Sequence, residues 1–369
     1  MQTTRYILKT ILFLLIVLAA QVLLSLDYHF IAWEDPEEVS EVDVPPVTIP
    51  DPGIYAPSEE VLAAQRFQTS YPGIGFLWKS HLGSSDTAIL QWSDQDPVEL
   101  FTDQYGFINS PEAIELQQAG NRIEILGLGG SFMQGAATVF HDFFSIYDRF
   151  YYSMATHRHT FPMFSAVFEK YADTVQPSLV VLGLNEASPA LIEDYRNWTA
   201  SGLDWFAYHS GTWAGPPIDS RPNLGPLNNW GTGYALATAV LRKIGLYKST
   251  PPAPEDQISG TVQNIERIAG KCEQIGARLL VLYIPSKATT LSGNSKGLSV
   301  MEGILNRLES SAIDYLDLRP IFKNAKNPSS LYYVVDGHWN KYGMVESAKA
   351  VERWVVSNLQ GDGAAALGR

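Results

Sequence analysis

Short apolar runs alternate with longer amphipathic stretches from residue 122 to residue 359. The apolar runs have the length of buried strands and cover residues 122–128, 179–184, 278–284 and 312–318. Apolar residues recur at helical spacing over residues 161–174, 259–274, 298–310 and 341–359. Strands that alternate with helices indicate a parallel sheet covered on both faces. We therefore predict a three-layer α/β/α domain over residues 113–359, with a doubly wound, mainly parallel sheet.

The first 33 residues show a different pattern. Residues 10–26 carry no charge and are almost long enough to cross the hydrocarbon core of a membrane as a helix. Arg5 and Lys9 precede this run and acidic residues follow it, a bias that leaves the N-terminus in the cytoplasm. We predict a transmembrane anchor over residues 1–33. A cleaved signal peptide is the alternative, although no A-x-A-like site follows the run.

Four segments flank or interrupt the alternating pattern. Residues 34–60 are rich in proline and acidic side chains, which predicts an extended stalk. Residues 61–112 show no sustained period, and we expect an N-terminal elaboration packed on the main domain. Residues 187–255 form an insertion rich in aromatic residues. It is either a binding loop for flat ligands such as sugar rings or a satellite core, and the sequence favours neither. We expect a disordered tail at residues 360–369.

Composition narrows the possible partners. The net charge of -13 argues against nucleic acid and against anionic lipid surfaces, because both attract clustered Lys and Arg. The single cysteine, Cys272, excludes an intramolecular disulfide and a multi-cysteine zinc site. We predict neither a metal nor a cofactor.

A serine follows the first predicted strand, in the run Gly127-Leu-Gly-Gly-Ser131-Phe-Met-Gln-Gly135. Glycines allow a tight turn there, and a helix that begins after it would direct backbone N–H groups at the site. The run matches neither a dinucleotide fingerprint, because Phe132 replaces the third glycine, nor a phosphate loop. It also departs from the G-x-S-x-G elbow at Met133. Alone, it is equally compatible with a structural turn.

Two further groups could act with Ser131. Asp336 and His338 precede the last predicted helix, and residues two apart in an extended segment project to the same side. A carboxylate on one imidazole nitrogen leaves the other free to accept a proton. A capping aspartate beside a solvated histidine is the alternative, and no third ligand supports a metal pair. Asn185 ends a strand at the sheet edge where Ser131 is expected, and its amide is either an oxyanion donor worth about 3 kcal/mol or a turn residue.

Together these groups resemble the SGNH, or GDSL-like, hydrolase family. The resemblance is carried by Gly129-Gly-Ser131 for the Gly-Asp-Ser block, with Gly130 in place of Asp, by Gly183-Leu-Asn185-Glu186 for the Gly-x-Asn-Asp block, and by Asp336-Gly-His338 for the Asp-x-x-His or Asp-x-His block. Asp103-Gln-Tyr-Gly106-Phe107 is similar to a Gly-Phe segment that precedes the first block in membrane-linked members. The family implies a flavodoxin-like sheet.

The resemblance also implies a role for each residue. Ser131 would be the nucleophile, His338 the general base and Asp336 its orienting carboxylate. Asn185 and the Ser131 amide would stabilise the oxyanion. The family's second block adds a glycine N–H, but no glycine lies between residues 143 and 161. Ser153, Met154 and Ala155 are the candidates for that backbone donor, and we choose Ala155.

Among the other histidines, four lie between Ser131 and the last predicted helix and lack a motif, and we interpret them as structural or surface residues. They are His141, His157, His159 and His209.

The resemblance implies a serine esterase or O-acyltransferase that acts on an acyl ester, with acetyl as the expected group. Within the family, the resemblance is to membrane-tethered, alginate-acetylation-like proteins. We therefore expect an envelope or exported glycan as substrate. We also expect a membrane-bound acyl donor or assembly partner. The expected location is the bacterial inner membrane, with one span and the main domain in the periplasm. The alternative is an inactive SGNH-like domain that serves as a binding or assembly subunit.

Overall fold

Five parallel strands form the central sheet, in the order β6-β5-β7-β8-β9. The structure is a computed structural model that describes residues 68–80, 89–90, 98–99, 101–201, 254–293, 295, 297–334 and 337–359. The strands are β5 (Ile125–Leu128), β6 (Tyr151–Ser153), β7 (Leu179–Leu184), β8 (Arg278–Tyr283) and β9 (Tyr315–Asp317). Because β5 lies between β6 and β7, the order of strand addition reverses there. Ligands bind beyond the carboxyl ends of the strands at such a switch point.

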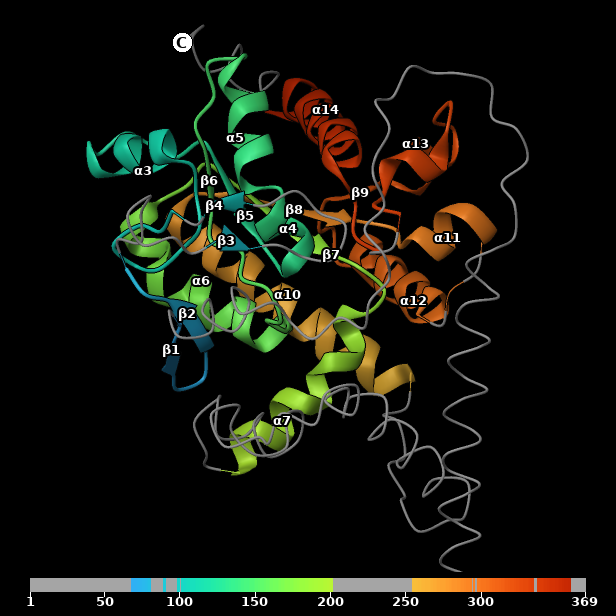
Figure 1. Cartoon of the computed structure of the whole chain (residues 1–369). Helices are drawn as coiled ribbons and strands as arrows, with labels where there is room; N and C mark the ends of the chain where they lie inside the picture. Colours follow the sequence, from blue (N-terminus) through green and yellow to red (C-terminus); the bar gives the residue numbers. More distant parts are fainter. Residues whose placement is uncertain are drawn as a thin grey trace, which may run out of the picture. The chain divides into compact units, whose positions relative to one another are not determined.

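Helices cover both faces of this sheet (Figure 1). One face packs on α6 (Phe161–Val175), α10 (Pro254–Ile275) and α12 (Leu298–Ser310). The other packs on α4 (Ser131–Gly135), α5 (Ala137–Ser145), α13 (Arg319–Lys323) and α14 (Lys341–Asn358). Alternate strand residues serve the two faces: Leu126 belongs to the first core and Ile125 to the second. The predicted α/β class with a mainly parallel sheet is confirmed.

The predicted elements agree with the structure where the sequence pattern is long. The bounds of β7 and α12 are those expected. Helix α10 begins at Pro254, five residues before the predicted start. The edge strand β6 was not predicted, because three residues are too few to show a period.

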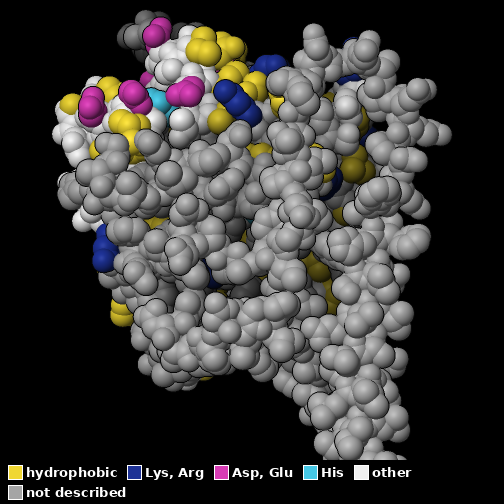
Figure 2. All heavy atoms as spheres, viewed as in Figure 1, with side chains coloured by type: hydrophobic (Ala, Val, Ile, Leu, Met, Phe, Trp, Pro, Cys, Tyr) yellow, Lys and Arg dark blue, Asp and Glu magenta, His cyan; other side chains and the backbone are white. Residues whose placement is uncertain are grey.

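Residues 103–118, the last part of the segment before the sheet, contact edge strand β6. The segment contains two antiparallel pairs, β1 (Gln68–Tyr71) with β2 (Gly75–Trp78) and β3 (Ile89–Leu90) with β4 (Val98–Glu99), and then α3 (Pro111–Gln118). Asn109 exchanges two hydrogen bonds with the Ser153 backbone, at 2.9 and 2.7 Å. The buried Asp103 carboxylate accepts from the Tyr152 hydroxyl. On the face in Figure 2, acidic side chains gather over the end of the domain that holds α3.

Several predicted segments lie outside the described residues: the anchor (1–33), the stalk (34–60), the tail (360–369) and most of the insertion (187–255). The described part of the insertion forms η2 (Ser188–Leu191), α7 (Ile192–Ser201) and the first residues of α10. Among the described helices, none combines the length and the apolar character that a membrane span requires.

Candidate active site

Ser131 lies at the start of α4, three residues after β5 ends. Gly129 makes this sharp turn possible, because its φ of 148° lies in the region that L side chains rarely adopt. A side chain there would also collide with Met133, whose Cγ would lie 2.8 Å from the added Cβ. The strand, the glycine turn and the short helix together fix the position of Ser131.

The Ser131 hydroxyl contacts His338, as the sequence predicts. Ser131 Oγ lies 2.7 Å from His338 Nε2, although 207 residues separate the two in the chain. Both side chains are partly buried. This is hydrogen-bond distance, so the imidazole is placed to accept the hydroxyl proton when its other nitrogen carries a hydrogen.

His338 sits on a narrow loop with defined attachments. Tyr332 and Trp339 form an antiparallel bridge, and the Tyr333 N–H donates to the His338 carbonyl at 3.1 Å. The Trp339 indole N–H donates to the Phe132 carbonyl at 2.9 Å. The rings of Phe132 and His338 are in contact, with their centroids 4.5 Å apart. Phe132, the residue after the serine, therefore contacts both His338 and Trp339.

Helix α11 (Lys287–Ser292) and helix α14 anchor the two ends of this loop. The Lys287 ammonium donates to the carbonyls of Tyr333 and Val334, at 2.9 and 2.6 Å. Asn340 caps α14 through its side chain and donates to the Tyr332 carbonyl at 3.0 Å. Nothing in the sequence pattern singles out Lys287. Asp336, the predicted carboxylate partner, lies outside the described residues.

Asn185 follows the last residue of β7, at the carboxyl edge of the sheet. Its side-chain oxygen accepts from the Ala187 N–H at 2.9 Å, which leaves the amide NH₂ as the group that can donate elsewhere. Gly183 allows this strand end to approach the serine helix closely. A Cβ on Gly183 would lie 2.2 Å from the Met133 Cγ, so the segment that holds Asn185 packs directly on the segment that holds Ser131.

The last third of the chain matches a known protein family in sequence. Residues 247–366 match the family model described as the SGNH hydrolase-like domain of acetyltransferase AlgX. Residues 247–366 are therefore similar to an SGNH hydrolase-like domain. The matched range contains Asp336 and His338, whereas Ser131 and Asn185 precede it. No curated protein matches the chain in sequence.

Solved structures with remote similarity include SGNH-type and acetyl-transferring proteins. A GDSL-like lipase from Bacteroides thetaiotaomicron is 12% identical over 63% of this chain and 88% of its own, with a TM-score of 0.38. An acetyl xylan esterase is 11% identical over 63% and 100%, with a TM-score of 0.39. The periplasmic domain of a Salmonella ser. Paratyphi A lipopolysaccharide acetyltransferase is 10% identical over 68% and 90%, with a TM-score of 0.38.

The candidates for the backbone donor of the second block lie at the end of β6 and just after it. The Met154 N–H donates to the Gly127 carbonyl at 2.8 Å, as expected for strand pairing. The Ala155 N–H, which we predicted as an oxyanion donor, donates to the Ser153 hydroxyl at 3.2 Å. The Ser153 N–H donates to Asn109. All three candidate amides therefore have partners other than a substrate in this structure, and the role of Ala155 stays a prediction.

Three of the remaining histidines are buried beside main-chain or amide groups. His141 Nδ1 lies 3.2 Å from the Tyr151 carbonyl oxygen. The backbone N–H of His157 donates to the side-chain oxygen of Gln134 at 2.6 Å. His159 Nε2 lies 2.7 Å from the Phe76 carbonyl oxygen, and burial lowers the pKa of His159 to about 4. Among the described residues, no group of three or more His, Cys, Asp or Glu could hold a metal. His209 lies outside them.

Proposed function

We propose that this protein is a serine esterase or O-acyltransferase in which Ser131 carries the acyl group. The supporting observation is the 2.7 Å contact between Ser131 Oγ and His338 Nε2. His338 takes the hydroxyl proton as Ser131 attacks the acyl carbonyl, and the Asn185 amide donates to the developing oxyanion. His338 returns the proton to the leaving alcohol. Water or an acceptor hydroxyl then releases the acyl group by the reverse sequence.

The proposed substrate is an acetyl ester of an envelope or exported glycan. The match to an acetyltransferase domain supports an acetyl group. The apolar, uncharged run at residues 10–26 supports a membrane anchor, which would place the domain outside the cytoplasm. An anchored enzyme would meet its glycan as it is exported and would draw on a membrane-bound acyl donor.

A serine-directed fluorophosphonate probe and p-nitrophenyl acetate test the chemistry. We expect the purified protein to be labelled and to hydrolyse the ester, and Ser131→Ala to abolish both. Ser310→Ala is the matched control, because Ser310 is exposed and its hydroxyl bonds only its own helix, at Asn306. Labelling that persists in Ser131→Ala would contradict the proposal. Adding a glycan acceptor and measuring acetyl transfer by mass spectrometry separates transferase from esterase.

The second candidate is an inactive SGNH-like binding or assembly subunit. The observation that favours it is the engagement of the Ala155 N–H by Ser153, which removes one expected oxyanion donor. This candidate predicts glycan binding without Ser131-dependent labelling.

A further inference from the structure

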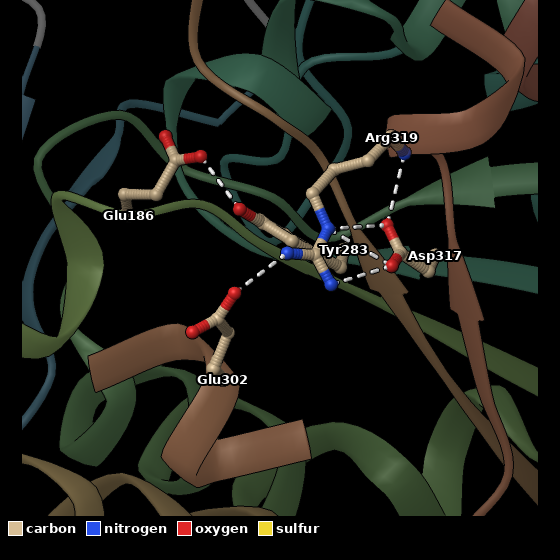
Figure 3. Close-up of polar contacts among 5 residues, drawn as sticks. All are labelled: Glu186, Tyr283, Glu302, Asp317 and Arg319. Atoms are coloured by element: carbon tan, nitrogen blue, oxygen red, sulfur yellow. Dashed lines mark hydrogen bonds and ion pairs between the residues drawn. The ribbon is translucent and has the colours of Figure 1, made fainter. Parts of the chain in front are cut away.

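Glu186 directly follows Asn185, and its carboxylate is bound from two sides. Glu186 is 8% exposed. Its Oε1 accepts from the Tyr283 hydroxyl at 2.6 Å and its Oε2 from the Ser286 N–H at 2.8 Å. Figure 3 shows the Glu186 carboxylate and the Tyr283 hydroxyl facing each other. A buried carboxylate with a donor on each oxygen holds its own main chain firmly in place.

Tyr283 is in turn held by charged groups from two other elements. It is the last residue of β8 and is fully buried. The Arg319 guanidinium carbon lies 5.1 Å from the centre of its ring, within cation–π range. Arg319 bonds Asp317 at 2.8 Å and reaches Glu302 at 3.4 Å. The ends of β7, β8 and β9 and helix α12 are thereby joined in one network (Figure 3).

Tyr283 acts as a hydrogen-bond donor in this network at all ordinary pH values. Burial, and then the adjacent Glu186 carboxylate, raise the pKa of Tyr283. The hydroxyl therefore keeps its proton. The Glu186 main chain is also packed closely from outside, because a Cβ on Gly297 would lie 2.3 Å from the Glu186 carbonyl oxygen.

We propose that Glu186 and Tyr283 are positioning residues for Asn185, and that Arg319 keeps the Tyr283 ring in place. This inference rests on the proposed function. Within the part of the chain that the structure describes, the Asn185 side chain bonds the nearby Ala187 N–H, so the position of its amide follows the main chain at residues 185–187. An oxyanion donor loses its effect when it is displaced by about 1 Å. The bond from Tyr283 to Glu186 therefore transmits its effect to catalysis through Asn185.

A double-mutant cycle tests this route. We expect Tyr283→Phe to lower kcat for p-nitrophenyl acetate about tenfold, with KM nearly unchanged, because an oxyanion interaction acts in the transition state. In the Asn185→Ala background the same substitution should lower kcat less than about twofold, because the group it positions is gone. An equal loss in both backgrounds, or no loss in either, would overturn the inference.

Two further variants separate positioning from a general loss of stability. Ser165→Ala removes a buried hydrogen bond away from the site, from the α6 hydroxyl to the Asn264 carbonyl of α10, and should lower the melting temperature while leaving kcat unchanged. Glu186→Gln keeps an acceptor for Tyr283 and should retain more activity than Glu186→Ala. If Tyr283→Phe does not fold, the two Glu186 variants carry the same cycle. An intact protein without Ser131-dependent hydrolysis would overturn the proposed function and this inference together, whereas an active protein with additive effects would overturn the inference alone.

Discussion

Two histidine-bearing segments lie against the turn that holds Ser131, and they differ in what their imidazoles contact. His338 is partly buried and faces the serine hydroxyl at 2.7 Å. His159 is buried and faces the Phe76 carbonyl oxygen at 2.7 Å, while its own carbonyl oxygen would lie 3.8 Å from a Cβ on Gly130. Both histidines are close to the nucleophile. The partner of the imidazole, rather than its nearness to the serine, decides which one can serve as a base.

The surroundings of the two segments differ in the same way. The His338 loop is attached by backbone bonds, one lysine and one indole, and its residue Val334 is exposed. In the segment after β6, the His157 backbone N–H and the His159 imidazole are bound inside the fold, at Gln134 and Phe76. Proton transfer requires a histidine that can change charge, and burial makes the charged form of His159 costly.

The sharpest test of this comparison is the carboxylate of the His338 segment. Asp336→Asn should lower kcat about 10⁴-fold, as in other triads, because the imidazole loses the group that fixes its tautomer and stabilises its cation. The hydrolysis rate of p-nitrophenyl acetate measures the loss. Asp314→Asn is the matched control, since Asp314 is an exposed partner of Arg278. A loss below tenfold would mean that the attachments of the loop alone orient His338.

Removing the predicted oxyanion donor should have the next largest effect. Asn185→Ala should lower kcat about 10²- to 10³-fold with little change in KM, because the amide acts on charge that appears only in the transition state. Asn121→Ala, at an exposed turn, is the control and should match the unmodified protein. A rise in KM with kcat unchanged would assign Asn185 to substrate binding instead.

Lys287 tests whether the attachments of the loop matter. Lys287→Met removes two charge-assisted bonds to loop carbonyls and should lower kcat about tenfold, equivalent to about 1.4 kcal/mol. Lys287→Arg keeps donors and should lose less. Lys349→Met, which removes an exposed ion pair with Glu346, is the control. Equal rates for Lys287→Met and the unmodified protein would show that the loop holds itself.

The buried histidine should affect stability rather than rate. The pKa of His159 is about 4 in the folded state, against about 6.5 unfolded, so the unfolded state binds more protons between these values. Stability is therefore full above about pH 6.5 and falls by up to about 3 kcal/mol as the pH drops to about 4. His159→Gln can keep the bond to Phe76 and should remove this part of the acid sensitivity. Chemical denaturation from pH 7 to pH 4 measures it, and an unchanged slope would contradict the assignment.

The sequence predicts the central elements because they are long and regular. The six apolar residues of β7 and the amphipathic period of α12 specify both their type and their ends. The pairing of Ser131 with His338 spans 207 residues, and it is predictable because a serine after a strand and a histidine just before the last helix converge at one sheet edge.

The supporting groups could not be predicted in the same way. The bond between Tyr283 and Glu186 joins residues 97 apart, and neither residue departs from what a strand end or a turn would contain. Lys287 contacts main-chain carbonyl oxygens. Every residue carries such an oxygen, so the side-chain pattern does not indicate this contact. Such contacts depend on which residues of neighbouring strands lie side by side in the folded protein. The apolar periodicity of the sequence does not identify those residues.

The close fit of Gly183 on Met133 has a consequence for how this site can change over generations. The two residues share one volume, so a larger side chain at position 183 is tolerable only where position 133 has become smaller. A lineage can therefore enlarge position 183 only after position 133 has become smaller. For the same reason, transplanting this site onto another scaffold requires the two motifs to be moved as one piece.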